Sequence, residues 1–359
     1  MKFEFNKDVS RILDYLIFPR LFYFIDDEEH EEDGLKSLIK EEFLNYVEEL
    51  IKNFKPYQAL IEKFYQKDIY SNIDFIHIVM KAYSPYTYDD EHKYLTDLAN
   101  IDDHSFRTEF MKSLITMDDD VSLEDMDHFL VDESQAIKYI NHLKIESSSK
   151  WNMLLMIQDP KKNLLEFIEL MTKLEPYFYS YYQKHEHEVA IVGEALAKKL
   201  SINTNETLKA LSYHAVNYDF GDSDSCHLYI SATFPYIVRF SDQVPCRIVW
   251  GLEMEESFKK LHELNEDKMV QRVKVFKALG DKTRYDTIRL IASGISSIKE
   301  IATQLDVSSA TISYHINEFL TSGIISLNKS KDKKSQYVVD YEKLEYVLDE
   351  LRVDLNFPK

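Results

Sequence analysis

The sequence predicts a mainly α protein of the α+β class, in which a helical N-terminal domain with a small antiparallel sheet precedes a smaller C-terminal domain. Apolar residues recur at helical spacing over much of residues 1–204, and short β-branched and aromatic runs follow in residues 205–259. The charge then changes sign. Residues 268–359 hold 15 Lys and Arg against 12 Asp and Glu, whereas residues 1–267 hold 28 against 51. We therefore expect a third segment, residues 260–359, in which any contact with nucleic acid is concentrated.

The first segment, residues 1–204, is expected to be acidic and mostly helical. GLKSLIKEEFLNYVEELIKNF places its apolar residues on one helical face, and NLLEFIELMTKLEPYFYSYYQ repeats this pattern until Pro176, where we expect the helix to be interrupted. The acidic runs DDEEHEED and DDDVSLEDMD are typical of solvated loops or helix starts. The aromatic cluster at 177–182 is expected in the core, with the lining of an effector pocket as the alternative.

The second segment, residues 205–259, is expected to form the antiparallel sheet. TLKALSYHAV, CHLYISATF and CRIVWGLEM have the composition of short strands and are bounded by turn residues such as Pro235 and Pro245. Cys226 and Cys246, the two cysteines of the chain, fall on neighbouring predicted strands. We expect them to be buried packing residues, with a redox switch as the alternative.

Several classes of site find no support in the sequence. The chain has seven glycines and contains neither GxGxxG nor GxxxxGK[ST], so we expect no nucleotide cofactor. His185 and His187 of HEHEVA would lie about 200° apart on a helix and could not share a metal ion, because the zinc-protease spacing needs histidine where Val189 stands. Since no catalytic constellation is apparent, we expect a protein that is not an enzyme and has no cofactor or metal.

The expected location is the cytoplasm. No run of about 18 uncharged apolar residues would span a bilayer, and the start of the sequence lacks the layout of a signal peptide. We therefore expect no membrane partner.

The segment IKEIATQLDVSSATISYHINEFLTSGII, residues 298–325, predicts two helices separated by a tight break at Asp306 and Val307. Such a helix-turn-helix places its second helix in the DNA major groove. Ser308 is the expected N-cap and is also expected to bind DNA at the helix start, where backbone NH groups can contact a phosphate. His315 is expected on the apolar side, packed or bonded to backbone, with a contact to DNA as the alternative. The residues expected to face the groove are Ser309, Ala310, Thr311, Ser313, Tyr314 and Asn317.

After Gly323, which we expect to end the second helix, IISLNKSKDKKSQYVVDY predicts a β-hairpin. Ile325 and Leu327 alternate on its first strand, and Tyr337, Val339 and Tyr341 alternate on its second. The loop between the strands carries Lys329, Lys331, Lys333 and Lys334. A basic hairpin beside a recognition helix indicates a winged helix, whose lysines are expected to contact DNA phosphate or the adjacent minor groove.

Residues from about 270 to 355 resemble the ArsR-type winged helix-turn-helix of bacterial transcriptional regulators. FKALGDKTR is similar to the entry motif of that family, and SSATISYHINEFLTSGII is similar to its recognition core. This sequence departs from the family pattern with Lys282 in place of a helix-opening proline and Asp306 in place of a turn glycine. The cysteine pair that binds metal in the family would fall at Ser297 and Lys299, so the resemblance implies no metal sensing there.

The resemblance also implies a homodimer that pairs through helices near 268–279 and 342–353. The apolar residues expected to supply its surface are Val273, Phe276, Leu344, Val347, Leu348 and Leu351. Together these features favour a DNA-binding transcriptional regulator that binds double-stranded DNA and whose N-terminal domain senses an unknown small-molecule or protein effector. The alternative is a protein-interaction adaptor that uses the winged helix as a binding module.

Overall fold

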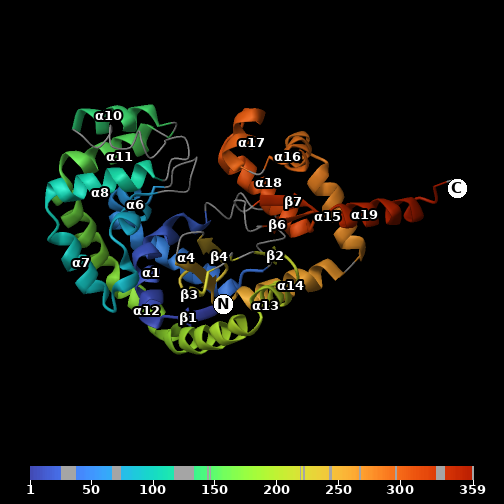
Figure 1. Cartoon of the computed structure of the whole chain (residues 1–359), viewed down its shortest axis with the longest axis horizontal. Helices are drawn as coiled ribbons and strands as arrows, with labels where there is room; N and C mark the ends of the chain where they lie inside the picture. The colour runs from blue at the N-terminus through green and yellow to red at the C-terminus, as the bar shows by residue number, and fades with distance from the viewer. Residues whose placement is uncertain are drawn as a thin grey trace. The chain divides into compact units, whose positions relative to one another are not determined.

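The computed structural model describes residues 1–25, 38–66, 74–116, 133–143, 145, 147–218, 220, 223–241, 245–266, 268–295, 297–328 and 336–357. These residues form a mainly helical protein with two small mixed sheets, as Figure 1 shows. The chain divides into two compact units. A helical unit comprises Lys7–Ile25 and Leu44–His187, and a sheet-containing unit comprises Met1–Asn6, Asp26–Phe43 and Glu188–Lys359.

The helical unit follows the amphipathic patterns of the sequence. Its elements are α1 (Lys7–Ile17), η1 (Phe18–Tyr23), α4 (Glu41–Phe54), η2 (Lys55–Tyr57), α5 (Gln58–Tyr65), α6 (Phe75–Ala82), η3 (Pro85–Thr87), α7 (Glu91–Ala99), α8 (Asp103–Ile115), α10 (Glu133–His142), α11 (Ser147–Gln158) and the first part of α12 (Pro160–Ile202). Their apolar faces bury aromatic side chains in edge-to-face contacts, such as those of Phe18 with Phe54 and with Phe178. Phe178, Tyr181 and Tyr182 are buried, which confirms the core position expected for this part of the aromatic cluster.

Pro176 lies inside α12 and does not end it, so the expected interruption is wrong. A proline removes one backbone hydrogen bond from a helix interior. Here Leu174 and Phe178, on either side of the proline, are both fully buried. We attribute the continuous helix to the burial of this apolar face, which offsets the lost hydrogen bond.

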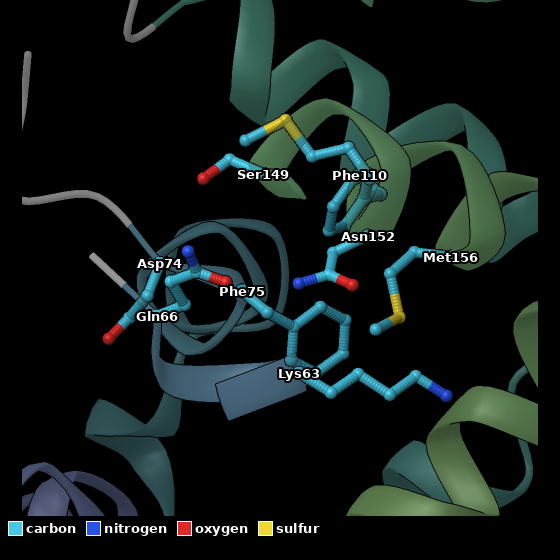
Figure 2. A pocket seen from close by; sticks show the side chains of 9 residues that line it. Lys63, Gln66, Asp74, Phe75, Phe110, Ser149, Asn152 and Met156 are labelled. Atoms are coloured by element: carbon cyan, nitrogen blue, oxygen red, sulfur yellow. The ribbon is translucent and has the colours of Figure 1, made fainter. Parts of the chain in front are cut away.

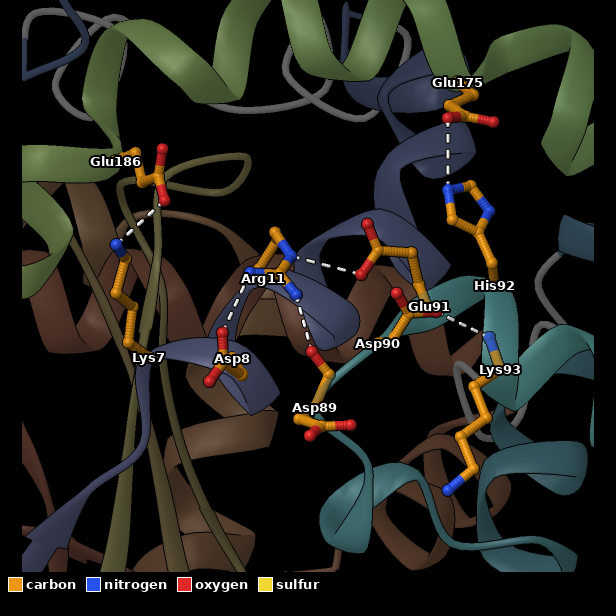
Figure 3. Close-up of polar contacts among 10 residues, drawn as sticks. All are labelled: Lys7, Asp8, Arg11, Asp89, Asp90, Glu91, His92, Lys93, Glu175 and Glu186. Atoms are coloured by element: carbon orange, nitrogen blue, oxygen red, sulfur yellow. Dashed lines mark hydrogen bonds and ion pairs between the residues drawn. The ribbon is translucent and has the colours of Figure 1, made fainter.

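Two sets of polar contacts join helices within the helical unit. The Arg11 guanidinium bonds the Asp8 carboxylate at 2.9 Å, Glu91 at 3.1 Å and the Asp89 carbonyl at 2.8 Å, so it connects α1 to the start of α7 (Figure 3). The second set is deeper. Arg20 donates to both Asp74 carboxylate oxygens at 2.6 Å, and both side chains are buried.

The first sheet has the strand order β1-β3-β5-β4. Its strands are β1 (Lys2–Phe5), β3 (Ser225–Ser231), β4 (Val238–Ser241) and β5 (Cys246–Gly251). β1 and β3 are parallel, as are β3 and β5, and within the described part of this sheet only the β4–β5 pair is antiparallel. The predicted small antiparallel sheet is therefore wrong in direction, and it omitted β1. Most of the segment predicted as a first strand at 207–216 instead forms α13 (Thr204–Leu211) and a turn, because its apolar residues also fit one helical face, and only its last residue, Val216, lies in a strand.

The remaining elements of the sheet-containing unit are C-terminal to this sheet, apart from the short strand β2 (Val216–Asn217). They are α14 (Met254–Glu266), α15 (Lys268–Leu279), α16 (Lys282–Ala292), α17 (Ile298–Leu305), α18 (Ser309–Ser322), β6 (Ile325–Asn328), β7 (Gln336–Val339) and α19 (Tyr341–Asp354). β6 and β7 form an antiparallel hairpin, and β2 pairs with β6 in parallel, which gives the order β2-β6-β7. The predicted domain boundary near 260 falls inside α14, and the division at 260 stays a prediction.

A search of the described residues found no helix that combines the length and the low charge needed to cross a lipid bilayer.

Candidate nucleic-acid interface

The candidate interface is built on α17 and α18, which are joined by a tight turn. Ser297 caps α17 by accepting a hydrogen bond from the Glu300 amide. Asp306 ends α17 in the left-handed conformation, with φ 55° and ψ 46°, and Val307 donates its amide back to the Ala302 carbonyl at 3.1 Å. Because aspartate tolerates this conformation better than most residues, the turn forms without a glycine at this position.

α18 begins and ends where the sequence predicts. The Ser308 hydroxyl accepts a hydrogen bond from the Thr311 amide at 3.0 Å, so Ser308 is the N-cap. It also lies 2.8 Å from the Thr311 hydroxyl. Gly323 ends the helix at a positive φ of 73°, which favours a residue without a β-carbon.

One face of α18 packs into the C-terminal core and thereby orients the other face. Ile312, Ile316 and Phe319 are buried together with Ile301 and Ala302 of α17, and the core continues into β6, β7 and α19. A helix fixed along about two turns of its apolar face cannot rotate about its axis without opening this core. The residues on the opposite face therefore have a defined direction.

Five of the six residues expected to face a groove lie on the opposite face. Ala310 is exposed, and Thr311, Ser313, Tyr314 and Asn317 are partly exposed. Ser309 is only 3% exposed, so its expected position at the groove is wrong. The reason is its spacing, because Ser309 precedes Ile312 by three residues and shares the apolar face with it.

His315 is buried at 6% exposure, as expected for the apolar side of α18. Neither ring nitrogen has a hydrogen-bond partner among the described residues, so the expected alternative of a backbone bond is not observed. Burial lowers the pKa of His315, the positive charge of Arg284 lowers it further, and the negative charge of Asp281 acts in the opposite direction. The imidazole is therefore held in its neutral form more strongly than an exposed histidine.

Arg284 connects α16 to α18 through an ion pair that the sequence analysis missed. Its guanidinium lies 3.6 Å from the Glu318 carboxylate, and both side chains are largely buried. Asp281 caps α16 by accepting a hydrogen bond from the Arg284 amide at 2.9 Å, and this bond lowers the pKa of Asp281. Arg284 lies within the FKALGDKTR motif, so the motif marked the residue but not its partner.

The hairpin that follows α18 has the predicted strands. β6 and β7 pair in the register Ile325↔Val339 to Asn328↔Gln336. Tyr341, expected on the second strand, begins α19 instead because Asp340 caps that helix by accepting from the Lys343 amide. The four loop lysines, Lys329, Lys331, Lys333 and Lys334, lie outside the described residues.

The two helices expected to form a dimer surface differ in what they expose. Val273 of α15 is 60% exposed and Leu348 of α19 is 50% exposed, whereas Val347 is buried and Phe276 and Leu344 pack against the C-terminal core. Only part of the predicted surface is therefore available to a partner. Arg272 ties α15 to α19 through ion pairs with Glu350 at 2.8 Å and Asp354 at 3.0 Å, which sequence spacing did not reveal.

Two other candidate features are weaker. Cys226 and Cys246 are directly paired on β3 and β5, with their Sγ atoms 2.8 Å apart, and both are buried free thiols.

A cavity of about 20 Å³ in the helical unit is lined by residues that include Ser149, Asn152 and Met156 (Figure 2). It has room for about one water molecule, so it is too small for an organic effector.

Comparison of the chain with protein families, curated proteins and solved structures found no match.

Proposed function

We propose that this chain is a DNA-binding transcriptional regulator whose C-terminal region is a winged helix-turn-helix. The observation that carries the proposal is the outward face of α18. Ala310, Ser313, Tyr314 and Asn317 lie along it at helical spacing, and none of them carries a charge. Short uncharged polar side chains allow a helix to approach base edges closely and to exchange hydrogen bonds with them.

The charges near this face support the same proposal. Glu318 is the only acidic residue of α18, and it is paired with Arg284 and largely buried, so it does not repel phosphate from the outward face. The loop between β6 and β7 adds four lysines in sequence, against one aspartate. In this arrangement α18 contacts base edges in the major groove, and the lysines of the hairpin loop bind the DNA phosphates. The resemblance to ArsR-type regulators points the same way.

We further propose that the protein acts as a homodimer. Met269, Val270 and Val273 expose apolar surface on α15, and Leu348 and Val353 do so on α19. Two helices of one chain that each expose such surface favour an isologous pairing with a second copy. A dimer would present two copies of α18 to two half-sites about one helical turn of DNA apart, or about 34 Å.

The proposal is tested by selecting bound sequences from a library of random duplexes with the full-length protein. We expect one enriched motif with two-fold symmetry. Asn317→Ala and Ser313→Ala should change the preferred sequence at a cost of about 1–3 kcal/mol per lost base contact, whereas Lys331→Ala should weaken all sequences alike and lower the salt slope by about 1. Asn45→Ala, at an exposed position of α4, is the matched control and should do neither. The absence of an enriched motif, together with no binding to random duplex at low salt, would refute the proposal.

A further inference from the structure

The two cysteines of the chain form a close pair inside the first sheet. Cys226 of β3 and Cys246 of β5 are direct partners in the parallel register, and their Sγ atoms lie 2.8 Å apart. Carbon atoms in ordinary packing contact are about 3.5–4.0 Å apart. The two side chains therefore turn toward each other and approach more closely than core packing requires.

The backbone around the pair meets the requirements of a disulfide without a large movement. Neighbouring strands lie about 4.7–4.9 Å apart, and the Cα atoms of a disulfide are usually about 4.4–6.8 Å apart. β3 is paired with β1 on its other side, and β5 with β4, so both strands are held in place. Two thiols that are fixed side by side in this way react as an intramolecular pair with a high effective concentration.

The surroundings of the pair favour a disulfide over other products of oxidation. Phe3 lies opposite Cys226 and is buried, and Leu228 and Ile248, the next pair on the same face of the sheet, are fully buried. A sulfinic acid ionises, and its charge would be costly in this apolar setting, whereas a disulfide is uncharged. Because the chain has two cysteines, no other pairing within one chain competes.

Hydrogen bonding gives the two thiols different roles. The Cys226 thiol donates to Cys246 Sγ, and this hydrogen bond, together with burial, raises the pKa of Cys226. Cys226 therefore keeps its proton, and Cys246 Sγ, which accepts the hydrogen bond, is the sulfur available for attack. Cys246 also has the greater exposure, 5% against 0% for Cys226. We therefore expect an oxidant to react first at Cys246.

We propose that hydroperoxides convert Cys226 and Cys246 into a reversible disulfide that cross-links β3 to β5. Cys246 Sγ attacks the hydroperoxide and the O–O bond breaks, so that Cys246 becomes a sulfenic acid and the hydroperoxide leaves as an alcohol, or as water if it is hydrogen peroxide. Cys226 Sγ then attacks the sulfenic sulfur. The S–S bond forms, the S–O bond breaks, and the hydroxyl leaves with the Cys226 proton as water. This chemistry is independent of the proposed DNA binding.

The disulfide would join the two inner strands of the sheet. Cys226 and Cys246 are 20 residues apart, and β4, which pairs with β5, lies between them in sequence. A cross-link over a loop of this length restricts the unfolded chain and lowers the equilibrium constant for unfolding by about 100-fold. We therefore expect the oxidised protein to resist unfolding more strongly than the reduced protein.

Peptide mapping of the full-length protein tests the chemistry. The reduced protein is treated with a small excess of hydrogen peroxide, remaining thiols are alkylated in urea, and the digest is analysed by mass spectrometry with and without dithiothreitol. We expect the peptides of Cys226 and Cys246 to be joined, with the loss of two hydrogen atoms, in a chain of monomeric mass on non-reducing electrophoresis. Alkylation of both cysteines, a sulfinic acid at either one, or a disulfide between chains would overturn the proposal.

Two single substitutions test the order of attack. In Cys226→Ser, Cys246 lacks a thiol to condense with and should accumulate a sulfenic acid, which dimedone traps. In Cys246→Ser, Cys226 is the remaining thiol and should react at least about tenfold more slowly, because it is fully buried. Equal trapping in the two variants would overturn the assigned roles. The peptide map of the unmodified protein does not depend on the folding of either variant.

Urea unfolding followed by the fluorescence of Trp250, which is fully buried on β5, measures the consequence. The oxidised protein should have an equilibrium constant for unfolding about 100-fold smaller than the reduced protein. Dithiothreitol should remove the difference, because it reduces a disulfide but not a methionine sulfoxide. Cys226→Ser treated with peroxide is the control and should gain no stability. A cross-linked protein of unchanged or lower stability would overturn the role of the disulfide as a link between the strands.

Discussion

Replacing His315 with leucine is expected to stabilise the protein, although the histidine lies in the core of the proposed DNA-binding region. His315 is 6% exposed and both of its ring nitrogens lack partners among the described residues. A buried polar group without a partner costs about 1–3 kcal/mol, whereas an apolar side chain of similar volume has no such cost. His315→Leu should therefore raise the free energy of unfolding by about 1–3 kcal/mol at pH 7.5.

The advantage of His315→Leu should grow as the pH falls. Burial, the charge of Arg284 and the opposing charge of Asp281 together leave the pKa of His315 below its ordinary value. The unfolded chain then binds a proton, near pH 6.5, before the folded chain does, so stability is lost below that pH by at most about 1.4 kcal/mol per unit. The leucine variant lacks this loss, and the difference between the two proteins should be larger at pH 5.5 than at pH 7.5.

Urea unfolding followed by the fluorescence of Trp250, which is fully buried in the sheet-containing unit, measures both effects. His104→Leu, at an exposed position of α8, is the control and should change neither stability nor its pH dependence. A His315→Leu protein that is less stable at pH 7.5, with a difference from the unmodified protein that is independent of pH, would refute the reasoning. In that case His315 forms a stabilising interaction that burial alone does not reveal.

Three further predictions concern other parts of the fold. Asp74→Asn breaks the buried pair with Arg20 and should lower the free energy of unfolding by about 3–5 kcal/mol in urea titrations at pH 7. Burial raises the pKa of Asp74, but Arg20 and the hydrogen bond from His77 outweigh burial, so the pKa in the folded protein lies below its ordinary value. The stability from this pair should therefore be present above pH 4 and decline as the pH falls below it. Asp306→Gly removes the cost of φ 55° and should gain about 0.5–1 kcal/mol in the same assay, and a loss would show that the aspartate side chain stabilises the turn. Val273→Glu with Leu348→Glu should halve the mass measured by light scattering, whereas Ile202→Glu, at another exposed apolar position, should leave a dimer; a monomer before substitution would contradict the proposed pairing.

The sequence predicted best where neighbours along the chain determine the structure. The two helices of 298–325, the Ser308 cap and the Gly323 end depend on contacts within a few residues, and all are observed. It failed where distant contacts decide. β1 forms because Phe3 pairs opposite Cys226, which no local pattern indicates, and Pro176 is tolerated because the helix around it is buried.

The outward face of α18 was likewise predicted where helical spacing decides and missed where tertiary packing decides. Helical spacing identified five of its residues. Ser309 was predicted to be exposed because it is polar, but it lies one turn before Ile312 and is buried on the same face. The partners of Arg284 and Arg272 also escaped prediction, because charged residues are common and their pairing across helices depends on tertiary structure. β2 is two residues long and gives no periodic signal.

The pairing of β1 with β3 has a consequence for synthesis of the chain. Lys2 pairs with Ser225, so about 220 residues must be added before β1 meets its partner strand. At about 5–20 residues per second, translation leaves β1 unpaired for on the order of 10–45 s. During that time the amphipathic helices of 7–187 can already fold on the ribosome. β1, with Phe3 and Phe5, still lacks its partner strand and is accessible to chaperones. The sheet that carries both cysteines is thus among the last parts of the N-terminal region to be completed.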